Sequence, residues 1–182
     1  TFNIEIIVLP GPISDFSYTA ALCLQDTVFF TGTSVPAPYN IINYLWNFDD
    51  ATTQATVNAQ KRFTVAGPQN VRYRIYADNG CVGDTTKLLT ISPLPLAVMA
   101  VTSASCAGDS VQISDFSTVS AGTIVSWRYN FGDGNTLVRS TNTPFYHTYS
   151  LPGTYTLSLV AVSNGGCFSD TAFSTLAVSA KP

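Results

Sequence analysis

Charged residues are scarce in this chain, and histidine is nearly absent. Of 182 residues, 8 are Lys or Arg, 11 are Asp or Glu and one is histidine, which gives a net charge of -3 and a pI of about 4.7. A chain with this balance has no basic surface to attract nucleic acid or an anionic membrane. Because His147 is the only histidine, neither a serine triad nor a histidine-based metal site can occur in more than one place.

Long apolar runs are missing as well. No segment approaches the roughly 18 apolar residues that a membrane-spanning helix requires, and no charged and then apolar leader opens this stretch. If the protein is exported, its signal is expected outside this stretch. The sequence also lacks a phosphate-binding G-x-x-x-x-G-K motif, an EF-hand loop and paired carboxylates at a useful spacing. We therefore predict no membrane insertion and no enzymatic activity.

The chain is rich in β-forming sequence instead. Its residues are 46% hydrophobic, which is ample for a large core. Val, Ile, Thr, Tyr and Phe are frequent, turn-forming Ser, Thr, Gly and Pro interrupt them about every ten residues, and no long segment places apolar residues at helical spacing. These features predict an all-β fold.

The sequence is built from a repeat. An offset of 83 residues brings Cys23 onto Cys106, and a three-residue insertion then changes the offset to 86, at which Cys81 meets Cys167. Core and turn positions between these ends also correspond: Val28 with Val111, Phe30 with Ile113, Tyr44 with Trp127, Trp46 with Tyr129, Phe48 with Phe131, Asp50 with Asp133, Phe63 with Tyr149, Gly67 with Gly153, Val71 with Leu157 and Tyr73 with Leu159.

Two domains follow from this repeat, over residues 12–93 and 94–182. Residues 1–11 are predicted to be the last strand of a preceding repeat and a linker, because PGP at 10–12 matches PLP at 93–95. The chain would then be a window cut from a longer tandem array.

Apolar residues alternate within each copy. The segments YLWNF at 44–48 and WRYNF at 127–131 each place three aromatic residues on one face of a strand, and VRYRI at 71–75 alternates in the same way. Several short strands of this kind in a unit of about 85 residues predict two tandem immunoglobulin-like β-sandwiches.

The segment YNFGDGNT at 129–136 contains an aspartate between two glycines. Gly132, Asp133 and Gly134 tolerate a positive φ, and the Asp133 carboxylate can accept backbone N–H bonds, so the segment is predicted to form a turn. The first copy has Asp49 and Ala51 in place of the two glycines, so its turn is expected to be tighter and differently shaped.

The second copy closely resembles the polycystic kidney disease (PKD) domain, whose signature is W-D-F-G-D-G, then H-x-Y, then G-x-Y and an alternating strand. The matching residues are Tyr129, Phe131, Gly132, Asp133, Gly134, His147, Tyr149, Gly153 and Tyr155. The first copy matches at Trp46, Phe48, Asp50 and Gly67 but has Lys61 in the place of the histidine, Phe63 for the tyrosine and Gln69 where the second copy has Tyr155.

This resemblance covers roughly residues 12–182 and implies a noncatalytic, repeated module of extracellular proteins. A cysteine before the first core strand and a G-C-x-x-D-T ending are similar to repeats of very large Bacteroidetes-type surface proteins, including gliding-motility adhesins exported by the type IX route. An extracellular location on the cell surface is therefore expected.

Repeat symmetry favours one disulfide in each domain, Cys23–Cys81 and Cys106–Cys167. Closing loops of about 60 residues would stabilise each domain by roughly 4 kcal/mol, and such bridges persist only in an oxidising compartment. Two alternatives stay open: zinc, for which the close C-x-x-C spacing is missing, and buried free thiols.

Two kinds of ligand site can be considered. No cofactor is expected, but calcium is a weak candidate at the adjacent Asp49 and Asp50, which turn formation explains equally well. Tyr39, Phe145 and Tyr146 fall in loop-like segments and are candidates for contacting a sugar, although packing within loops is the simpler role.

Three functions are compatible with the sequence. The leading hypothesis is an extended, disulfide-stabilised spacer in a large adhesin that acts in surface adhesion or gliding, with neighbouring repeats of the same chain as partners. The second is a module that binds a surface polysaccharide or protein. The third is an accessory pair of PKD domains in a secreted hydrolase.

Overall fold

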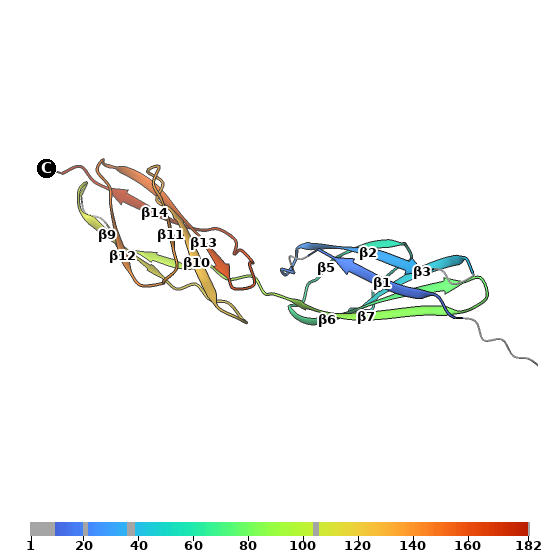
Figure 1. Ribbon diagram of the computed structural model, residues 1–182. Helices are drawn as coiled ribbons and strands as arrows, with labels where there is room; N and C mark the ends of the chain where they lie inside the picture. The colour runs from blue at the N-terminus through green and yellow to red at the C-terminus, as the bar shows by residue number, and fades with distance from the viewer. Residues whose placement is uncertain (1–9, 20–21, 36–38, 104–105, 182) are drawn as a thin grey trace, which may run out of the picture. The chain divides into compact units, whose positions relative to one another are not determined.

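The computed structural model describes residues 10–19, 22–35, 39–103 and 106–181. The chain forms two compact units, residues 1–91 and 92–182, which are called module 1 and module 2 (Figure 1). Strands and turns make up the described residues, which contain no helix, so the predicted all-β fold is confirmed. The predicted strand within residues 1–9 lies outside the described residues.

Module 1 is a sandwich of two antiparallel sheets. One sheet has the order β1-β2-β5, with β1 at Ile13–Tyr18, β2 at Thr27–Val35 and β5 at Asn58–Arg62. The other has the order β4-β3-β6-β7, with β4 at Thr53–Gln54, β3 at Ile41–Phe48, β6 at Gly67–Ala77 and β7 at Val82–Ile91.

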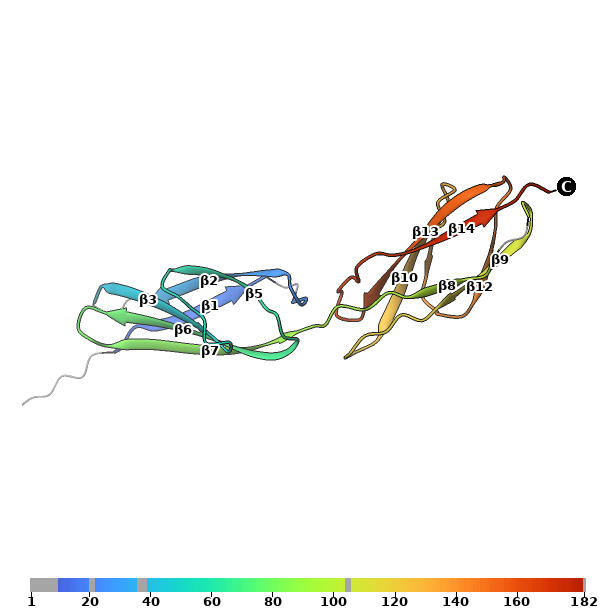
Figure 2. The ribbon, with the colours of Figure 1, turned by 180° about the vertical axis from the view of Figure 1, so that it is seen from behind.

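Module 2 repeats this arrangement (Figure 2). Its smaller sheet has the order β12-β9-β8, with β12 at Phe145–Thr148, β9 at Ser110–Asp115 and β8 at Met99–Val101. Its larger sheet has the order β11-β10-β13-β14, with β11 at Thr136–Arg139, β10 at Ile124–Asn130, β13 at Gly153–Ser163 and β14 at Ala172–Val178. The internal repeat of the sequence is therefore a repeat of the fold.

Alternation along the strands builds a separate core in each module. The alternating residues Trp46 and Phe48 on β3, and Tyr129 on β10, face inward as the sequence predicts and are nearly inaccessible. Corresponding positions are buried in both cores, among them Val28 and Val111, Phe30 and Ile113, Phe63 and Tyr149, Val71 and Leu157, and Tyr73 and Leu159. Each core consists of residues from its own module.

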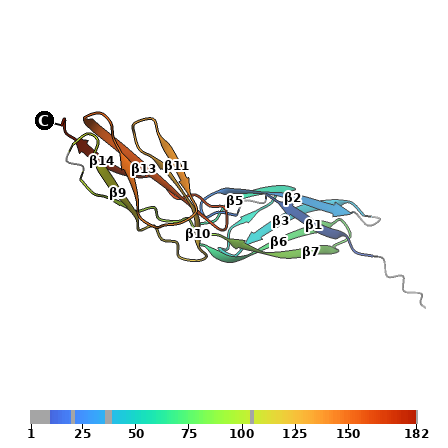
Figure 3. The same cartoon turned by 60° about the vertical axis from the view of Figure 1, so that its left-hand side comes forward.

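In each module the chain enters at one end and leaves at the opposite end. In module 1, Ile13 begins β1 beside Val35, whereas Ile91 ends β7 beside Gly67 (Figure 3). The 11 residues of β6 run between these ends, a distance of about 35 Å at the usual rise of a strand. We call them the upstream end, where the chain enters, and the downstream end, where it leaves.

Module 2 has the same polarity. Near its upstream end Leu96 is bridged to Thr118, and at its downstream end Gly153 pairs with Val178 at the end of β14. The 11-residue strand β13 connects the two ends.

The cysteines lie at these ends. Cys81 is in the turn between β6 and β7, at the upstream end of module 1, and Cys167 is in the equivalent turn of module 2, with its Sγ 4.0 Å from the carbonyl oxygen of Ser92. Cys23 lies before β2 and Cys106 before β9, both at the downstream end of their module; Cys106 is bridged to Ser179.

The predicted bridges within each domain, Cys23–Cys81 and Cys106–Cys167, are therefore wrong. Bridged cysteines have Cα atoms about 4.4–6.8 Å apart, whereas the two cysteines of a module are separated by nearly its full length. Cys81 and Cys106 are free thiols, whereas Cys23 and Cys167 are disulfide-bonded. Repeat symmetry identified corresponding cysteines without indicating at which end of the sandwich each one lies.

Candidate functional site

The most elaborate polar site of module 2 is the turn that follows β10. Gly132 and Gly134 have φ angles of 79° and 92°, and a Cβ at position 132 would lie 2.6 Å from the carbonyl oxygen of Thr156. The Asp133 carboxylate accepts a hydrogen bond of 3.0 Å from the backbone N–H of Asn135 and another of 3.0 Å from its side-chain amide. Asp133 thus stabilises the turn.

His147 on β12 completes this site. Its Nε2 lies 2.8 Å from Oδ2 of Asp133, and its ring stacks on Phe131 with a centroid distance of 4.0 Å. The same ring meets Tyr149 in a T-shaped arrangement with a centroid distance of 4.8 Å. The H-x-Y segment of the motif therefore links the turn after β10 to the opposite sheet.

Module 1 builds the same link from different residues. Asp50 accepts hydrogen bonds from the N–H and the hydroxyl of Thr52, at 3.1 and 2.6 Å, and forms an ion pair with Lys61. Lys61 lies 5.3 Å from the centroid of the Phe48 ring, as His147 lies on Phe131. Lysine and histidine thus occupy equivalent positions, but an imidazole is charged only when protonated.

The backbones of the two turns differ at one of the two glycine positions, because Gly132 has a left-handed φ of 79° and Asp49 does not. Ala51 occupies the position of Gly134. Its φ of 64° is a left-handed backbone conformation that residues other than glycine rarely adopt. Asp49, in the position of Gly132, uses its carboxylate to accept hydrogen bonds of 2.5 and 3.2 Å from the backbone and side-chain nitrogens of Asn70.

Electrostatics keep both turn carboxylates ionised. Hydrogen bonds from Lys61 and Thr52 lower the pKa of Asp50 to about 2. Burial raises the pKa of Asp133, but the hydrogen bonds from Asn135 and His147 outweigh it, so its pKa lies below the usual range. These shifts arise from the hydrogen bonds that hold each turn in place.

Among the remaining motif residues, the buried Tyr149 supports the turn of module 2. The Tyr149 hydroxyl donates a hydrogen bond of 3.0 Å to the carbonyl oxygen of Phe131, and Tyr155 stacks on Tyr149 at 4.2 Å. Burial raises the pKa of Tyr149 and of Tyr129 to about 12, so both stay protonated. Gly67 opens β6 with a φ of 106°, and Gly153 opens β13 with an ordinary φ.

The carboxylates proposed as weak calcium ligands are already engaged. Asp49 holds Asn70, and Asp50 holds Thr52 and the ammonium group of Lys61, whose positive charge opposes a second cation. Across the described ranges, no three His, Cys, Asp or Glu side chains lie together in a way that could hold a metal ion.

The three candidate sugar-contacting aromatics belong to different modules, with Phe145 and Tyr146 in module 2 and Tyr39 in module 1. Phe145 lies on β12 and not in a loop; its ring packs against Tyr129 at 5.0 Å, and Arg139 covers it at 4.5 Å. Tyr146, next along the same strand, points outward, is 65% exposed and accepts a hydrogen bond of 3.3 Å from Gln112. Tyr39 is half-buried in module 1, at a bend before β3.

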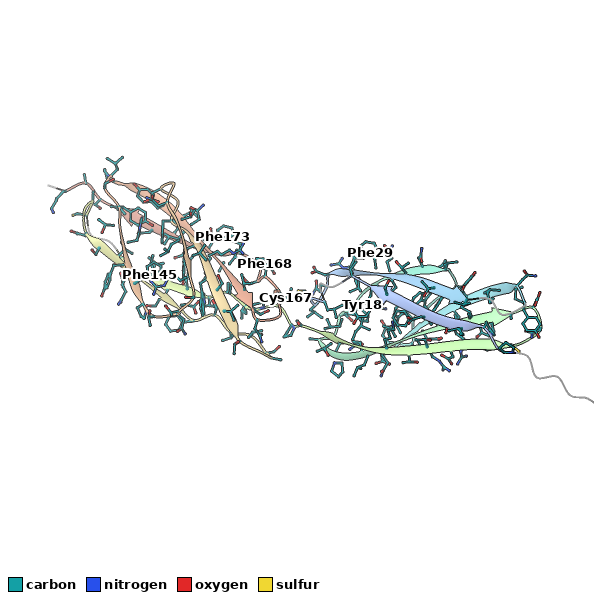
Figure 4. All side chains as sticks on the ribbon, viewed as in Figure 1. Tyr18, Phe29, Phe145, Cys167, Phe168 and Phe173 are labelled. Atoms are coloured by element: carbon teal, nitrogen blue, oxygen red, sulfur yellow. The ribbon has the colours of Figure 1, made fainter. Side chains whose placement is uncertain are left out.

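Other aromatic residues on the surface of module 2 were not selected from the sequence. Phe168 and Phe173 both belong to this module (Figure 4). Phe173 on β14 is 70% exposed, and the ring centroid of Phe168, in the segment before β14, lies 4.9 Å from the guanidinium of Arg128. Phe173 follows the alternation of β14, whose inward positions are Leu176 and Val178, so its outward direction could have been predicted. Phe168 lies outside any alternating run.

Each module also has an open hollow of about 350 Å³, and the two are not equivalent. In module 1 it is lined by Phe29, Gln54, Thr56, Asn58, Ala59 and Gln60. In module 2 it is lined by Ser117, Thr118, Val119, Thr123, Ile124, Trp127 and Asn142.

The indole N–H of Trp46 donates to the carbonyl oxygen of Thr56 at 2.9 Å, whereas the buried indole N–H of Trp127 has no acceptor among the described residues.

None of the described segments forms a helix long and apolar enough to cross a membrane.

Comparison with known protein families agrees with the motif. The sequence profile of the PKD domain matches twice, over residues 10–92 and 92–178. Similar solved structures include the PKD1 domain of Vibrio anguillarum Epp, with 23% identity over 50% of this chain and 99% of that one and a TM-score of 0.43. The PKD1 domain from Vibrio cholerae metalloprotease PrtV has 27% identity, covers 47% of this chain and 98% of that one, and has a TM-score of 0.41.

Fibronectin(III)-like modules of Clostridium thermocellum CbhA are similar over a longer stretch, with 11% identity over 91% of this chain and 95% of that one and a TM-score of 0.49. The two profile matches together span both sandwiches, each with its own turn, core and H-x-Y or K-x-F segment. The chain therefore belongs to the PKD domain family.

Proposed function

We propose that the two PKD domains are a noncatalytic spacer segment of a large extracellular adhesin, in which tandem modules hold an adhesive part away from the cell surface. Neighbouring modules of the same chain are the partners in this role. The resemblance of the sequence to repeats of gliding-motility adhesins favours this setting.

The observation that carries the proposal is that the chain enters and leaves each module at opposite ends. The chain enters module 1 beside Val35 and leaves it beside Gly67, at opposite ends of strands about 35 Å long. A module whose chain ends lie at opposite ends adds its whole length to an array, whereas one whose ends lie together would add little.

The connection between the modules supports the same role. Pro93 and Pro95 lie between β7 and β8, and each proline fixes its own φ and restricts the residue before it. A short connection of this kind favours a semi-rigid joint.

The chemistry of the turns also agrees with a structural role. The carboxylates of Asp50 and Asp133 and the side chains of Lys61 and His147 are all engaged in holding a turn to the opposite sheet. PKD domains are generally noncatalytic modules.

Small-angle X-ray scattering of the purified chain tests the proposal. A compact chain of this length would have a radius of gyration of about 16 Å, whereas two modules in line would reach on the order of 80 Å and a radius of gyration of about 23 Å. We expect the larger values, with or without a reducing agent. A compact particle in both conditions would contradict the spacer role.

Ligand binding is the second candidate function, and the outer face of module 2 is the observation that favours it. Phe168, Phe173 and Arg128 present two exposed rings and a cation. A panel of surface polysaccharides and intact cells, tested with the unchanged chain and with Phe168→Ala/Phe173→Ala, separates the two functions: only a recognition module would show saturable binding that the double substitution removes.

A further inference from the structure

Each module has one cysteine at each end. Cys81 and Cys167 lie in the turn at the upstream end, whereas Cys23 and Cys106 lie before the second strand of the smaller sheet, at the downstream end. Because strands about 35 Å long separate the two ends, neither module can form a disulfide between its own two cysteines. A bridge at Cys81 or at Cys106 therefore needs a partner outside its own module.

The internal repeat supplies a comparison for the two free thiols. Cys106 is the counterpart of Cys23, and in both the carbonyl oxygen accepts a hydrogen bond of 3.1 Å from an aspartate N–H three residues later. Cys81 is the counterpart of Cys167, and in both the carbonyl oxygen accepts a bond of 2.9 Å across the turn. Cys23 and Cys167 are disulfide-bonded, so their backbone settings are compatible with a bridge.

We propose that Cys106 forms a disulfide with the turn cysteine at the upstream end of the module that follows it in an array, and that Cys81 bonds in the same way to a module that precedes it. A second copy of this chain, placed after the first, would offer its own Cys81 to Cys106. The inference depends on the proposed tandem role in one respect, that a further module follows.

The direction in which the chain passes through each module makes this pairing selective. In a tandem array the downstream end of one module is followed by the upstream end of the next, so Cys106 meets a turn cysteine and not another residue of its own kind. The short connection raises the effective concentration of the two thiols to roughly the millimolar range or above.

The local contacts favour reaction at Cys81. The side-chain amide of Asn79 lies 3.2 Å from its Sγ, and the thiol is half-buried but not enclosed. Because the Sγ of Cys81 is partly exposed, a second sulfur can approach it, as disulfide exchange requires.

Oxidised glutathione is a sufficient oxidant for the bond. The Cys81 thiolate attacks one sulfur of the glutathione disulfide and releases one glutathione thiolate. The Cys106 thiolate then attacks the Cys81 sulfur of this mixed disulfide and releases the second. Two cysteine thiols are oxidised, one glutathione disulfide is reduced, and the two protons pass to the two glutathione thiolates.

Such bridges would give the array a second covalent connection at each joint, in addition to the peptide linker. Two connections resist bending and twisting more than one does, so the modules would hold their direction under load.

The test joins two copies of the chain with Val178 of the first directly before Pro10 of the second. In the repeat, Val178 is the counterpart of Ser92 and Pro10 is the counterpart of Pro93, so the new joint has the same length as the joint between module 1 and module 2. The protein is refolded in glutathione buffer, and its thiols are alkylated before peptide mapping. The single chain has two free thiols, Cys81 and Cys106. We expect the joined protein to keep two rather than four, with Cys106 of the first copy linked to Cys81 of the second.

Cys106→Ser in the first copy alone is the matched control and should leave Cys81 of the second copy open to alkylation, with the bonds at Cys23 and Cys167 unchanged as evidence of correct folding. Four alkylated thiols in the joined protein, or any other pairing, would overturn the inference. Because extension is measured by scattering in reducing buffer as well, failure of the bridge and failure of the spacer role give different results.

Discussion

At the scale of single residues, two of the described residues of module 1 have a left-handed backbone conformation although they are not glycine. Gln25 and Ala51 have φ angles of 67° and 64°, and their counterparts in module 2 are Gly108 and Gly134, with φ angles of 92° each. A left-handed conformation costs a residue with a Cβ about 1–2 kcal/mol. The second module avoids this cost with glycine.

Ala51→Gly is therefore expected to stabilise module 1 by about 0.5–1 kcal/mol, because relief of the left-handed strain exceeds the greater freedom that glycine gives the unfolded chain. Urea unfolding followed by fluorescence measures the change. Ala55→Gly, also exposed in module 1 but with an ordinary φ, is the matched control and should be neutral or destabilising. Equal effects of the two substitutions would show that Ala51 is not strained.

The two tryptophans occupy different positions of the repeat and differ in the hydrogen bonding of the indole N–H. Trp46→Phe removes the donor to the Thr56 carbonyl, whereas Trp127→Phe removes a buried N–H that has no acceptor among the described residues. Since a net hydrogen bond contributes about 1 kcal/mol and an unpaired buried donor is unfavourable, Trp46→Phe should cost module 1 about 1 kcal/mol more than Trp127→Phe costs module 2. Calorimetry of both variants measures this difference, and a larger loss at Trp127 would contradict the assignment.

The turn of module 2 should be sensitive to acid through Asp133. Its pKa is lower in the folded protein than in the unfolded chain, so the carboxylate contributes stability that is complete above its unfolded pKa of about 3.9. That contribution is lost as the pH falls through the folded value. Asp133→Asn should therefore destabilise module 2 at pH 7 by about 1–2 kcal/mol, and the difference from the unchanged protein should shrink below pH 4. Urea unfolding from pH 7 to pH 2.5 gives the profile; a difference that did not change with pH would exclude the carboxylate charge as its source.

At the scale of strands and turns, the sequence predicts what depends on local alternation. YLWNF and WRYNF became β3 and β10 with their alternate aromatics inward, because a strand places successive side chains on opposite faces. The turn at 132–134 was also predictable, because glycine and aspartate have local reasons to form it.

Features that depend on pairing between distant strands could not be predicted in this way. Phe145 stands in a four-residue strand beside β9, too short to show alternation, and was assigned to a loop. The cysteines were assigned to bridges within a domain because matching positions do not indicate which strand ends meet. The hydrogen bond between His147 and Asp133 joins residues 14 positions apart and depends on β12 crossing near the turn after β10.

At the scale of the whole molecule, the two modules have cores that share no residue. Tyr149 belongs to module 2, where its hydroxyl satisfies the carbonyl of Phe131, and its counterpart Phe63 in module 1 lacks a hydroxyl. The chain contains one tryptophan in each module, Trp46 and Trp127. Single-tryptophan variants can therefore report the unfolding of each module separately.

Tyr149→Phe should destabilise module 2 alone. It leaves a buried carbonyl without its donor, which costs about 1–3 kcal/mol, and each kcal/mol lowers the Tm of a domain of this size by about 4–8 °C. In the Trp46→Phe background, where fluorescence comes from Trp127, the transition should shift downward by this amount. In the Trp127→Phe background, where it comes from Trp46, the transition should stay in place. If both transitions moved together, the modules would unfold as one cooperative unit, and the separate cores would not be separate units of stability.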